Sequence, residues 1–165
     1  MRDLQKFLMV VIVAISTIGC DQVTKNYAKE NIQYSMPVLL FHGTVRLEYA
    51  ENSGAMLGFG SDWPFKIRFW LLTVVTGIFL LAVPLYVFFN KDLRNLQVVG
   101  LSLALGGGAS NLIDRWVNDG KVIDFLNVGI SSVRTGIFNL ADVSVLFGFF
   151  IFLLLSTHWK QVSTS

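Results

Sequence analysis

Three aspartates stand close to long apolar runs in the second half of the chain. Asp114 follows a glycine-bearing apolar stretch, Asp124 lies within KVIDFLNV, and Asp142 is at the start of another apolar run. A carboxylate near hydrocarbon is costly, so each is a functional hypothesis by default. Two carboxylates brought together in a partly dry site share a proton. One can then act as base on a water molecule while the other donates to a scissile carbonyl, with no metal or cofactor.

Other chemistries can be written for the same part of the chain. A serine nucleophile would need a base, for which Ser110 and Lys121 are the candidates, since no histidine lies nearby. Cys20 sits in an apolar segment without a histidine, and the three aspartates could instead hold a metal ion. The aspartates could also simply pair with basic residues at an interface, namely Arg115, Lys121 or Arg134. Residue types alone leave these alternatives open.

The composition indicates a membrane protein. Of the 165 residues, 53% are hydrophobic and 15% are charged, whereas soluble domains carry about 25% charged residues. The formal charge of +2 argues against a nucleic-acid partner, which would select a clustered basic face. The single cysteine excludes an internal disulfide and any site built from several cysteines. We therefore expect one integral membrane domain over residues 1–165.

Four apolar segments are predicted to cross the bilayer as helices. Residues 69–89 carry no charge and are long enough for a hydrocarbon layer of roughly 30 Å, with Pro84 expected to kink the helix. The first segment also resembles a cleaved signal peptide ending before Cys20, but a spanning helix that continues through DQVTK is preferred. The predicted spans are 5–25, 69–89, 96–113 and 138–156.

Residues 31–66 form the long first connection. Residues 37–41 and 44–49 are rich in Val, Leu, Phe and Tyr and are separated by His42-Gly43, which predicts two short strands and a turn. The glycine-rich stretch AENSGAMLGFG follows. We expect a small extracytoplasmic sheet and loop region that rests on the bilayer surface.

Basic residues are dense in the short segments at one side of this topology. They are Arg2, Lys6, Lys91, Arg94 and Lys160. Short, positively charged segments near helix ends stay in the cytoplasm. Both termini are therefore predicted to be cytoplasmic, which puts the three aspartates near the outer leaflet.

Asp21 and Lys25 stand four residues apart at the end of the first predicted span and share a helix face. They could form an ordinary ion pair at the membrane interface, worth little. Alternatively, Asp21 faces the bundle interior and orders that end of the helix. The spacing does not decide between the two.

Five motifs in order resemble those of the bacterial lipoprotein signal peptidases, also called signal peptidase II, a family of membrane aspartyl peptidases. They are DQVTK at 21–25, ENSGAMLGF at 51–59, ASNLIDR at 109–115, VIDF at 122–125 and FNLAD at 138–142. The resemblance covers nearly the whole chain. It implies an α-helical membrane protein: a four-transmembrane-helix bundle with a small extracytoplasmic β-sheet and loop region.

The resemblance also implies roles for individual residues. The family's catalytic pair matches Asp124 and Asp142. Residues at positions that shape or support the site or bind substrate are Asp21, Lys25, Asn52, Gly54, Asn111, Asp114, Arg115 and Asn139. Ser110 departs from the family, which usually has glycine there. We expect its side chain to crowd a helix contact and to hydrogen-bond within its own helix.

A member of this family removes the signal peptide of a prolipoprotein just before a cysteine that carries diacylglyceryl. The resemblance thus implies prolipoproteins and membrane lipids as partners, no metal or other cofactor, and a monomer. We expect the loop at 52–60 to hold the substrate over the dyad, with Phe59, Trp63 and Trp116 as candidate contacts. A small transporter using the aspartates for ions, or a membrane scaffold, are the competing interpretations.

Overall fold

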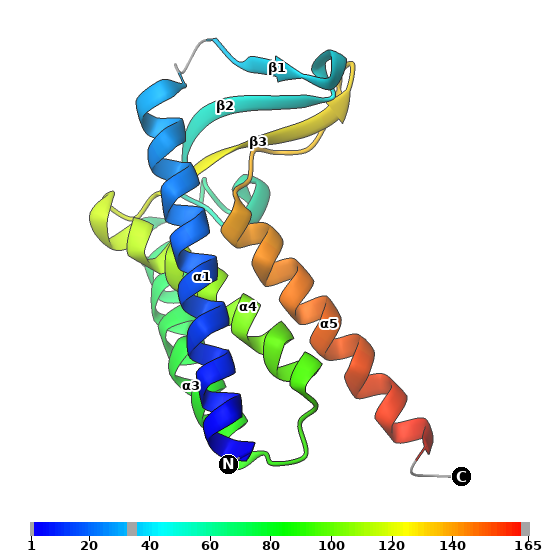
Figure 1. Ribbon diagram of the computed structural model, residues 1–165. Helices are drawn as coiled ribbons and strands as arrows, with labels where there is room; N and C mark the ends of the chain where they lie inside the picture. Colours follow the sequence, from blue (N-terminus) through cyan, green and yellow to red (C-terminus); the bar gives the residue numbers. More distant parts are fainter. Residues whose placement is uncertain (1, 33–35, 163–165) are drawn as a thin grey trace.

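Long helices make up most of the fold, and a small β-sheet lies at one end of them (Figure 1). The computed structural model describes residues 2–32 and 36–162, with side chains described for 4–32 and 36–156. Residues 33–35 of the predicted connection, and the side chains of Arg2 and Lys160, therefore lie outside the described part. The helices are α1 (Arg2–Asn31), α2 (Phe65–Arg68), α3 (Thr76–Phe89), α4 (Asn95–Val117) and α5 (Leu140–Val162).

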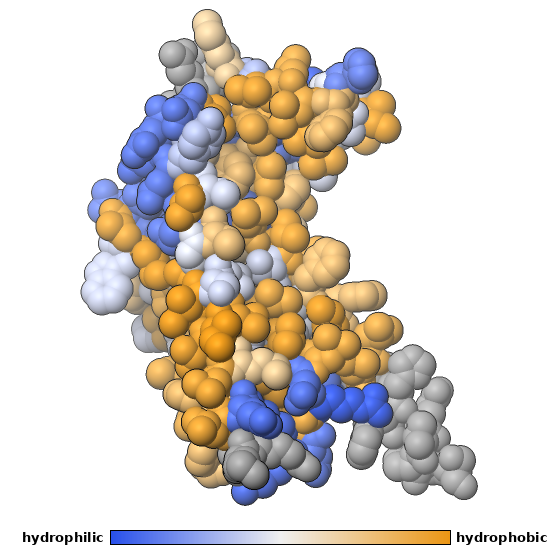
Figure 2. Space-filling model, in the orientation of Figure 1, coloured by the Kyte–Doolittle hydropathy of each residue, from blue (hydrophilic) through white to orange (hydrophobic). Residues whose placement is uncertain are grey.

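Within the described residues, three helices are long and apolar enough to cross a membrane by length and composition. They are Leu4–Asn31, Phe65–Phe89 and Asn95–Val117, while Leu140–Ser156 is a shorter apolar helix. The second of these joins α2 to α3 through a π-helical segment, η3 (Phe69–Val75), and contains Pro84. Figure 2 shows hydrophobic side chains over the middle of the helices on one face, with hydrophilic groups gathered beside the N-terminus.

The helices differ in length from the predicted spans. The first continues six residues beyond the predicted end at 25, and α4 continues past 113 to Val117, so Asp114 and Arg115 belong to its last turns. The last helix begins at Leu140 rather than at 138. The predicted spans 5–25 and 96–113 end too early because polar residues follow them, and hydropathy marks the hydrocarbon layer rather than the end of helical hydrogen bonding.

Glycines let α4 and α5 approach each other closely. A Cβ atom built at Gly148 would lie 2.4 Å from the carbonyl oxygen of Gly100, and one built at Gly107 would lie 2.4 Å from that of Ala141. Small residues at helix contacts allow this backbone approach in membrane proteins. The glycines of the third predicted span therefore serve packing, as their spacing in an apolar helix suggests.

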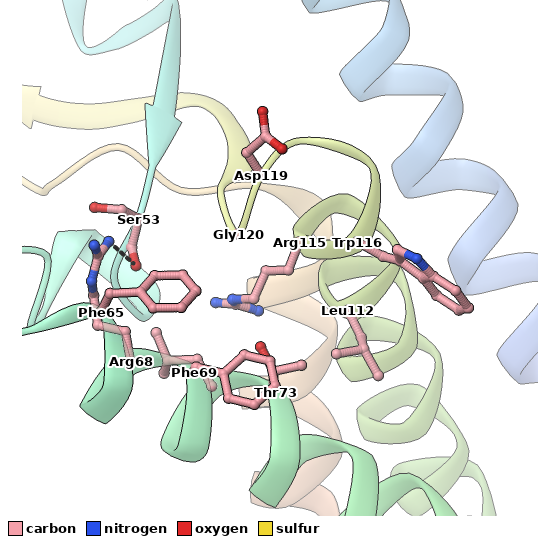
Figure 3. Close-up of a pocket in the computed structure, with 11 residues that line it drawn as sticks. Ser53, Phe65, Arg68, Phe69, Thr73, Leu112, Arg115, Trp116, Asp119 and Gly120 are labelled. Atoms are coloured by element: carbon pink, nitrogen blue, oxygen red, sulfur yellow. Dashed lines mark hydrogen bonds between the residues drawn. The ribbon is translucent and has the colours of Figure 1, made fainter.

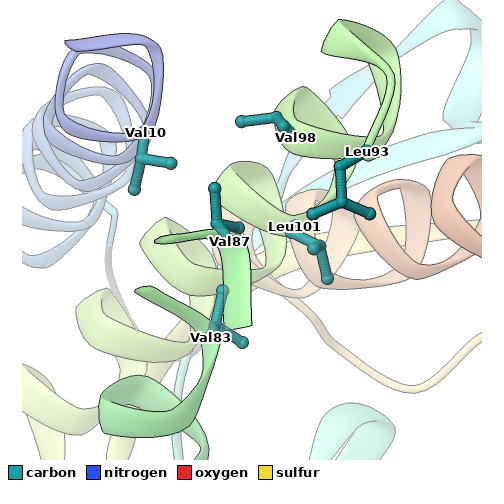
Figure 4. Packing of buried hydrophobic residues seen from close by; sticks show 6 residues of the cluster. All are labelled: Val10, Val83, Val87, Leu93, Val98 and Leu101. Carbon is teal, nitrogen blue, oxygen red and sulfur yellow. The ribbon is translucent and has the colours of Figure 1, made fainter. Parts of the chain in front are cut away.

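One of two buried apolar clusters in the described residues lies at the end of the helices opposite the sheet. Its buried residues come from α1, α3, α4 and the α3–α4 connection (Figure 4): Val10, Val83, Val87, Leu93, Val98 and Leu101. All are aliphatic and at most 8% exposed. This cluster holds three helices together with aliphatic side chains alone. A second apolar cluster lies at the sheet end and contains Ala28, Ile32, Tyr49, Ile123 and Phe125.

The sheet is antiparallel with strand order β1-β2-β3-β4. The strands are β1 (Val38–Leu40), β2 (Val45–Asn52), β3 (Val122–Ile130) and β4 (Val133–Arg134). The sequence prediction of two strands in 31–66 is confirmed, but it is incomplete because β3 and β4 come from a later segment. The sequence around Asp124 does not show the alternation that marks a strand, because both faces of β3 are buried over its first residues.

The close approach at Gly148 predicts a difference between two glycine-to-alanine variants. Gly148→Ala should lower the free energy of unfolding by about 1–3 kcal/mol, because the new methyl group must displace backbone atoms of α4. Gly77→Ala in α3 is the matched control, since nothing lies within 4 Å of a Cβ there. Its unfolding free energy should stay level or rise, because alanine favours a helix more than glycine does. Denaturant unfolding in detergent micelles measures both, and equal effects would contradict this account of the contact.

Candidate active site

Pairing of β2 with β3 fixes the position of Asp124. In the register of the two strands Ala50 stands opposite Asp124, and Asn52 stands opposite Val122. The side-chain amide of Asn52 on β2 donates to Asp124 Oδ2 on the neighbouring strand β3 at 2.8 Å. Asp124 is 1% exposed, so the strand presents its carboxylate to the protein interior rather than to solvent.

Asp142 occupies the first turn of α5, where Asn139 caps the helix. The Asp142 N–H donates to Asn139 Oδ1 at 2.8 Å, and the Asn139 N–H donates weakly back to Asp142 Oδ2 at 3.4 Å. This reciprocal pattern is a capping box with Asn at the cap and Asp three residues on. The FNLAD motif therefore has a direct structural reason: it starts the helix and fixes the Asp142 side chain at its mouth.

Two asparagine amides connect the carboxylates. Asn139 Nδ2 donates to Asp124 Oδ1 at 2.6 Å, while Asn111 Nδ2 from α4 donates to Asp142 Oδ1 at 2.9 Å. Asn139 Nδ2 also lies 3.2 Å from Asn111 Oδ1. Each aspartate thus accepts a hydrogen bond from an asparagine, and the two asparagines are hydrogen-bonded to each other. Neither carboxylate has an ion-pair partner among the described side chains.

Lys25 lies behind these amides as a buried cation. Its ammonium is 2.6 Å from Asp21 Oδ2, 2.8 Å from Asp114 Oδ2 and 2.9 Å from Asn111 Oδ1. Lys25, Asp21 and Asp114 are at most 2% exposed. Asp21 and Lys25 therefore form an interior pair, which decides between the two sequence-based alternatives for this pair.

Asp21 and Asp114 each also accept a hydrogen bond from a backbone N–H next to Asp142 or Asp124. Asp21 Oδ1 accepts from the N–H of Ala141, next to Asp142, at 2.8 Å. Asp114 Oδ2 accepts from the N–H of Ile123, next to Asp124, at 3.1 Å. The ion cluster thereby positions the backbone of both acids.

Ser110 and Gln22 join this cluster. Ser110 Oγ donates to Asp21 Oδ2 at 2.7 Å and accepts from Gln22 Nε2 at 2.9 Å, and the same Gln22 amide donates to Asp114 Oδ1 at 2.8 Å. The expectation that the Ser110 hydroxyl bonds within its own helix is wrong: it bonds across to α1, because Asp21 offers a charged acceptor. Gln22 was missed, although its position three residues before Lys25 places both on one helix face.

The loop after β2 is held by arginines. Gly54 N–H donates to Asn52 Oδ1 at 2.8 Å, and the Gly54 carbonyl accepts from Arg115 Nη2 at 3.0 Å. A Cβ at Gly54 would lie 2.5 Å from the Phe59 carbonyl oxygen, so only glycine fits. Arg68 Nη1 donates to the Ser53 carbonyl at 3.1 Å. All ten predicted site residues thus lie in one connected set of contacts.

Burial and charge set the protonation of Asp124. The pKa of Asp124 is raised from 3.8 to about 7, chiefly by loss of water around the carboxyl and next by the neighbouring charge of Asp142. Hydrogen bonds from Asn52 and Asn139 and the charge of Lys25 act against this rise. Burial wins because a desolvated carboxylate loses more than two neutral donors return. The site can therefore hold a proton near neutral pH.

Most of the alternative chemistries lack the required contacts. Ser110 is fully buried against Asp21, and Lys121 pairs with Glu51 at 2.7 Å on the surface, so the two form no nucleophile and base. Cys20 is exposed on α1. Among the described residues, no group of three or more His, Cys, Asp or Glu side chains is arranged to hold a metal ion.

A cavity of about 580 Å³ opens beside the loop (Figure 3). Its walls are mainly apolar, with Phe65, Phe69 and Leu72 on one side and Leu112 and Trp116 on the other. Arg68 and Arg115 also line it, and the buried Nε atom of each has no hydrogen-bond partner among the described residues. Phe59 and Trp63 pack edge to face with ring centroids 5.2 Å apart and do not line this cavity.

Comparisons with known proteins agree with this architecture. A family model described as signal peptidase (SPase) II matches residues 13–158. The chain is 32% identical over 160 residues to a lipoprotein signal peptidase of Syntrophus aciditrophicus, covering 96% of this chain and 97% of that one. One from Syntrophotalea carbinolica is 29% identical over 161 residues, covering 96% and 95%. A solved bacterial membrane enzyme superposes with a TM-score of 0.76 at 25% identity, covering 94% of this chain and 90% of that one.

The contact between Ser110 and Asp21 predicts a specific loss of stability. Ser110→Ala should lower the free energy of unfolding by about 1.5–3 kcal/mol, because it removes a buried hydrogen bond to a charged acceptor. Ser102→Ala is the matched control: Ser102 is equally buried on α4, but its hydroxyl bonds only to Val98 O of its own helix. The control should lose about 1 kcal/mol or less. Denaturant unfolding of both variants, with losses of equal size, would reject the cross-helix role of Ser110.

Proposed function

This chain belongs to the signal peptidase II family, and we propose that it cuts diacylglyceryl-modified prolipoproteins just before the lipidated cysteine with water activated by Asp124 and Asp142. As a peptidase of this family it removes signal peptides from prolipoproteins, and it is a multi-pass protein of the bacterial inner membrane. The aspartate mechanism, the exact bond and the orientation in the membrane are the proposal.

One observation carries the mechanism. Two buried carboxylates from different elements meet around a single amide, Asn139, which donates to Asp124 and caps the helix whose first turn contains Asp142. Neither has a cation in direct contact among the described side chains, and the pKa of Asp124 is raised to about 7. A pair of this kind keeps one proton between two acids at neutral pH.

The proposed reaction uses that proton twice. The ionised carboxylate takes a proton from water as the water oxygen bonds to the scissile carbonyl carbon, and the protonated carboxyl donates to the carbonyl oxygen. In the second step the carbon–nitrogen bond breaks, and the leaving amine nitrogen accepts a proton from the protonated carboxyl. A hydroxyl of the tetrahedral intermediate gives its proton to the other carboxylate as the new carboxyl group forms, which returns the pair to its starting charge. Which aspartate holds the proton at rest is a property of the pair and not of either residue.

The cavity beside the loop is the proposed place for substrate. Its apolar walls suit acyl chains or apolar signal-peptide side chains, and Arg115 links it to the loop and, through Asn111, to the dyad. Arg68 and Arg115, which line the cavity, are proposed to donate from their guanidinium groups to carbonyl oxygens of the peptide or of the ester groups. Trp116, 90% exposed at the rim, is proposed to contact lipid.

We further propose four spans with both termini cytoplasmic, which would put the dyad near the outer leaflet, and a monomeric enzyme. Exposed apolar side chains on β1 and on the turn after it, among them Leu39 and Phe41, support a sheet that rests on the bilayer surface. An ion transporter is disfavoured, because the acids gather at one end of the helices and the core at the other end is aliphatic.

Replacing either dyad acid should abolish cleavage. Asp124→Asn and Asp142→Asn should each lower turnover of a diacylglyceryl-modified prolipoprotein by at least about 10³-fold, because neither variant can both accept and donate the proton. Asp62→Asn, an exposed acid on the loop side, is the control and should cleave normally. Gel-based cleavage in detergent measures all three.

Adding a chelator distinguishes a metal-free aspartate pair from a metal site. The cleavage rate of the unaltered protein should be the same with and without chelator. Normal turnover by both Asp124→Asn and Asp142→Asn would contradict the proposed mechanism. Absence of cleavage by the folded, unaltered protein would instead point to the transporter or scaffold, and ion flux would then be measured.

The pH profile should show loss of activity on the alkaline side. The pKa of Asp124 is raised to about 7, so the shared proton is lost as pH rises through that value and the dyad then lacks its donor. We expect kcat/KM to fall above about pH 7 with a slope of one proton. Asn52→Leu removes a donor that favours the ionised carboxylate, so it should move this limb to higher pH. An alkaline limb that lies several units higher in the unaltered enzyme would contradict the assignment.

A further inference from the structure

A second hollow lies between α1 and α3, near the N-terminal end of α1. It has a volume of about 320 Å³ and is bounded by Val10, Val11 and Ala14 of α1, by Pro84 and Val87 of α3, and by Leu105 of α4. Phe7, Ile15 and Phe88, all more than half exposed, form its rim. The hollow is therefore a side groove open to the surroundings of the helices and lined by hydrocarbon.

Lys6 is the one charged residue among those that line the groove, and it marks one end. Its side chain is 6% exposed, and its ammonium donates to the Lys91 carbonyl oxygen at 2.8 Å. No carboxylate among the described side chains forms an ion pair with Lys6. A buried charge is costly unless an opposite charge accompanies it. One neutral carbonyl leaves two of the three ammonium hydrogens for a further acceptor.

The groove has the dimensions and direction of a lipid chain. From Lys6 to Ile15 it follows α1 for about 13 Å at 1.5 Å per residue. That length is close to the depth of one leaflet, half of a hydrocarbon layer of roughly 30 Å. The charged end lies level with the α3–α4 connection, where Figure 2 shows hydrophilic groups, and the apolar end points toward the middle of the helices. A lipid headgroup would thus lie at the polar end of the groove, and its acyl chain would lie along the apolar part.

We propose that this groove binds an anionic glycerophospholipid of the surrounding bilayer, with one acyl chain against Val11 and Ala14 and the phosphate on Lys6. The charge selects this occupant: a diacylglyceryl group is neutral and gives the ammonium no counter-charge. The groove also lies at the end of the helices away from the sheet and Asp124 (Figure 1). Basic pockets between membrane helices bind anionic headgroups in this way. The site is separate from the proposed cleavage site.

Native mass spectrometry of the full protein in neutral detergent tests the proposal. Equal amounts of phosphatidylglycerol and phosphatidylcholine with identical chains are offered, and the first bound lipid is counted. The unaltered protein should prefer phosphatidylglycerol, and Lys6→Gln should lower that preference about fivefold, the factor expected for one basic side chain at an anionic headgroup. Lys6→Arg should keep the preference. Lys29→Gln, which removes the same charge from the exposed far end of α1, is the control and should also keep it.

Filling the groove tests its place independently of charge. Val11→Phe should remove the first bound lipid of either kind, whereas Ile12→Phe, one residue away on the exposed face, should not. Thermal unfolding and cleavage activity check that each variant is folded. Retained lipid in Val11→Phe, an unchanged preference in folded Lys6→Gln, or equal binding of the two lipids by the unaltered protein would each overturn the proposal. If Lys6→Gln does not fold, the Val11→Phe and Ile12→Phe pair decides alone.

Discussion

The buried ammonium of Lys25 is the interaction on which the rest of the site depends. It neutralises part of the charge of Asp21 and Asp114, both nearly inaccessible, and so lets two carboxylates lie inside the end of a helix bundle. Those carboxylates in turn hold the backbone at Ala141 and Ile123, next to the two dyad acids. Breaking a buried ion pair by removing one partner is strongly destabilising, because it leaves an uncompensated charge. The fold of this region and the geometry of the dyad therefore have a common origin.

The molecule separates two kinds of interior. At the end near the N-terminus, aliphatic side chains such as Val83 and Val98 pack without polar groups, and glycines bring α4 against α5. At the sheet end, buried and hydrogen-bonded polar side chains such as Asp21, Lys25 and Asn139 lie beside a second apolar cluster that includes Ile123 and Phe125. Burial of the aliphatic side chains stabilises the fold, and this stabilisation offsets the cost of holding the two acids Asp124 and Asp142 close together.

Asparagines carry much of the organisation at the polar end. Asn139 satisfies the first turn of α5 and contacts Asp124, so one side chain both starts a helix and positions an acid from a strand. Asn111 contacts Lys25 and Asp142 and relays the ion cluster to the dyad. An amide can do this because it donates and accepts without a charge of its own. Ser110 adds a contact that glycine could not make, and it ties α1 to α4 at Asp21.

Hydropathy and motif order determined the apolar helices, the strands at the start of the sheet and the set of polar residues worth attention. These are local properties: an apolar run of sufficient length, a turn such as His42-Gly43, an Asn three residues before an Asp. Only the tertiary structure decided that 122–130 is a strand and that it pairs with β2, which brings Asn52 to Asp124 across 72 positions. It also decided that Lys25 faces inward and that Ser110 bonds to another helix. Partners so distant in sequence leave no periodic signal, because their contact depends on how whole elements pack.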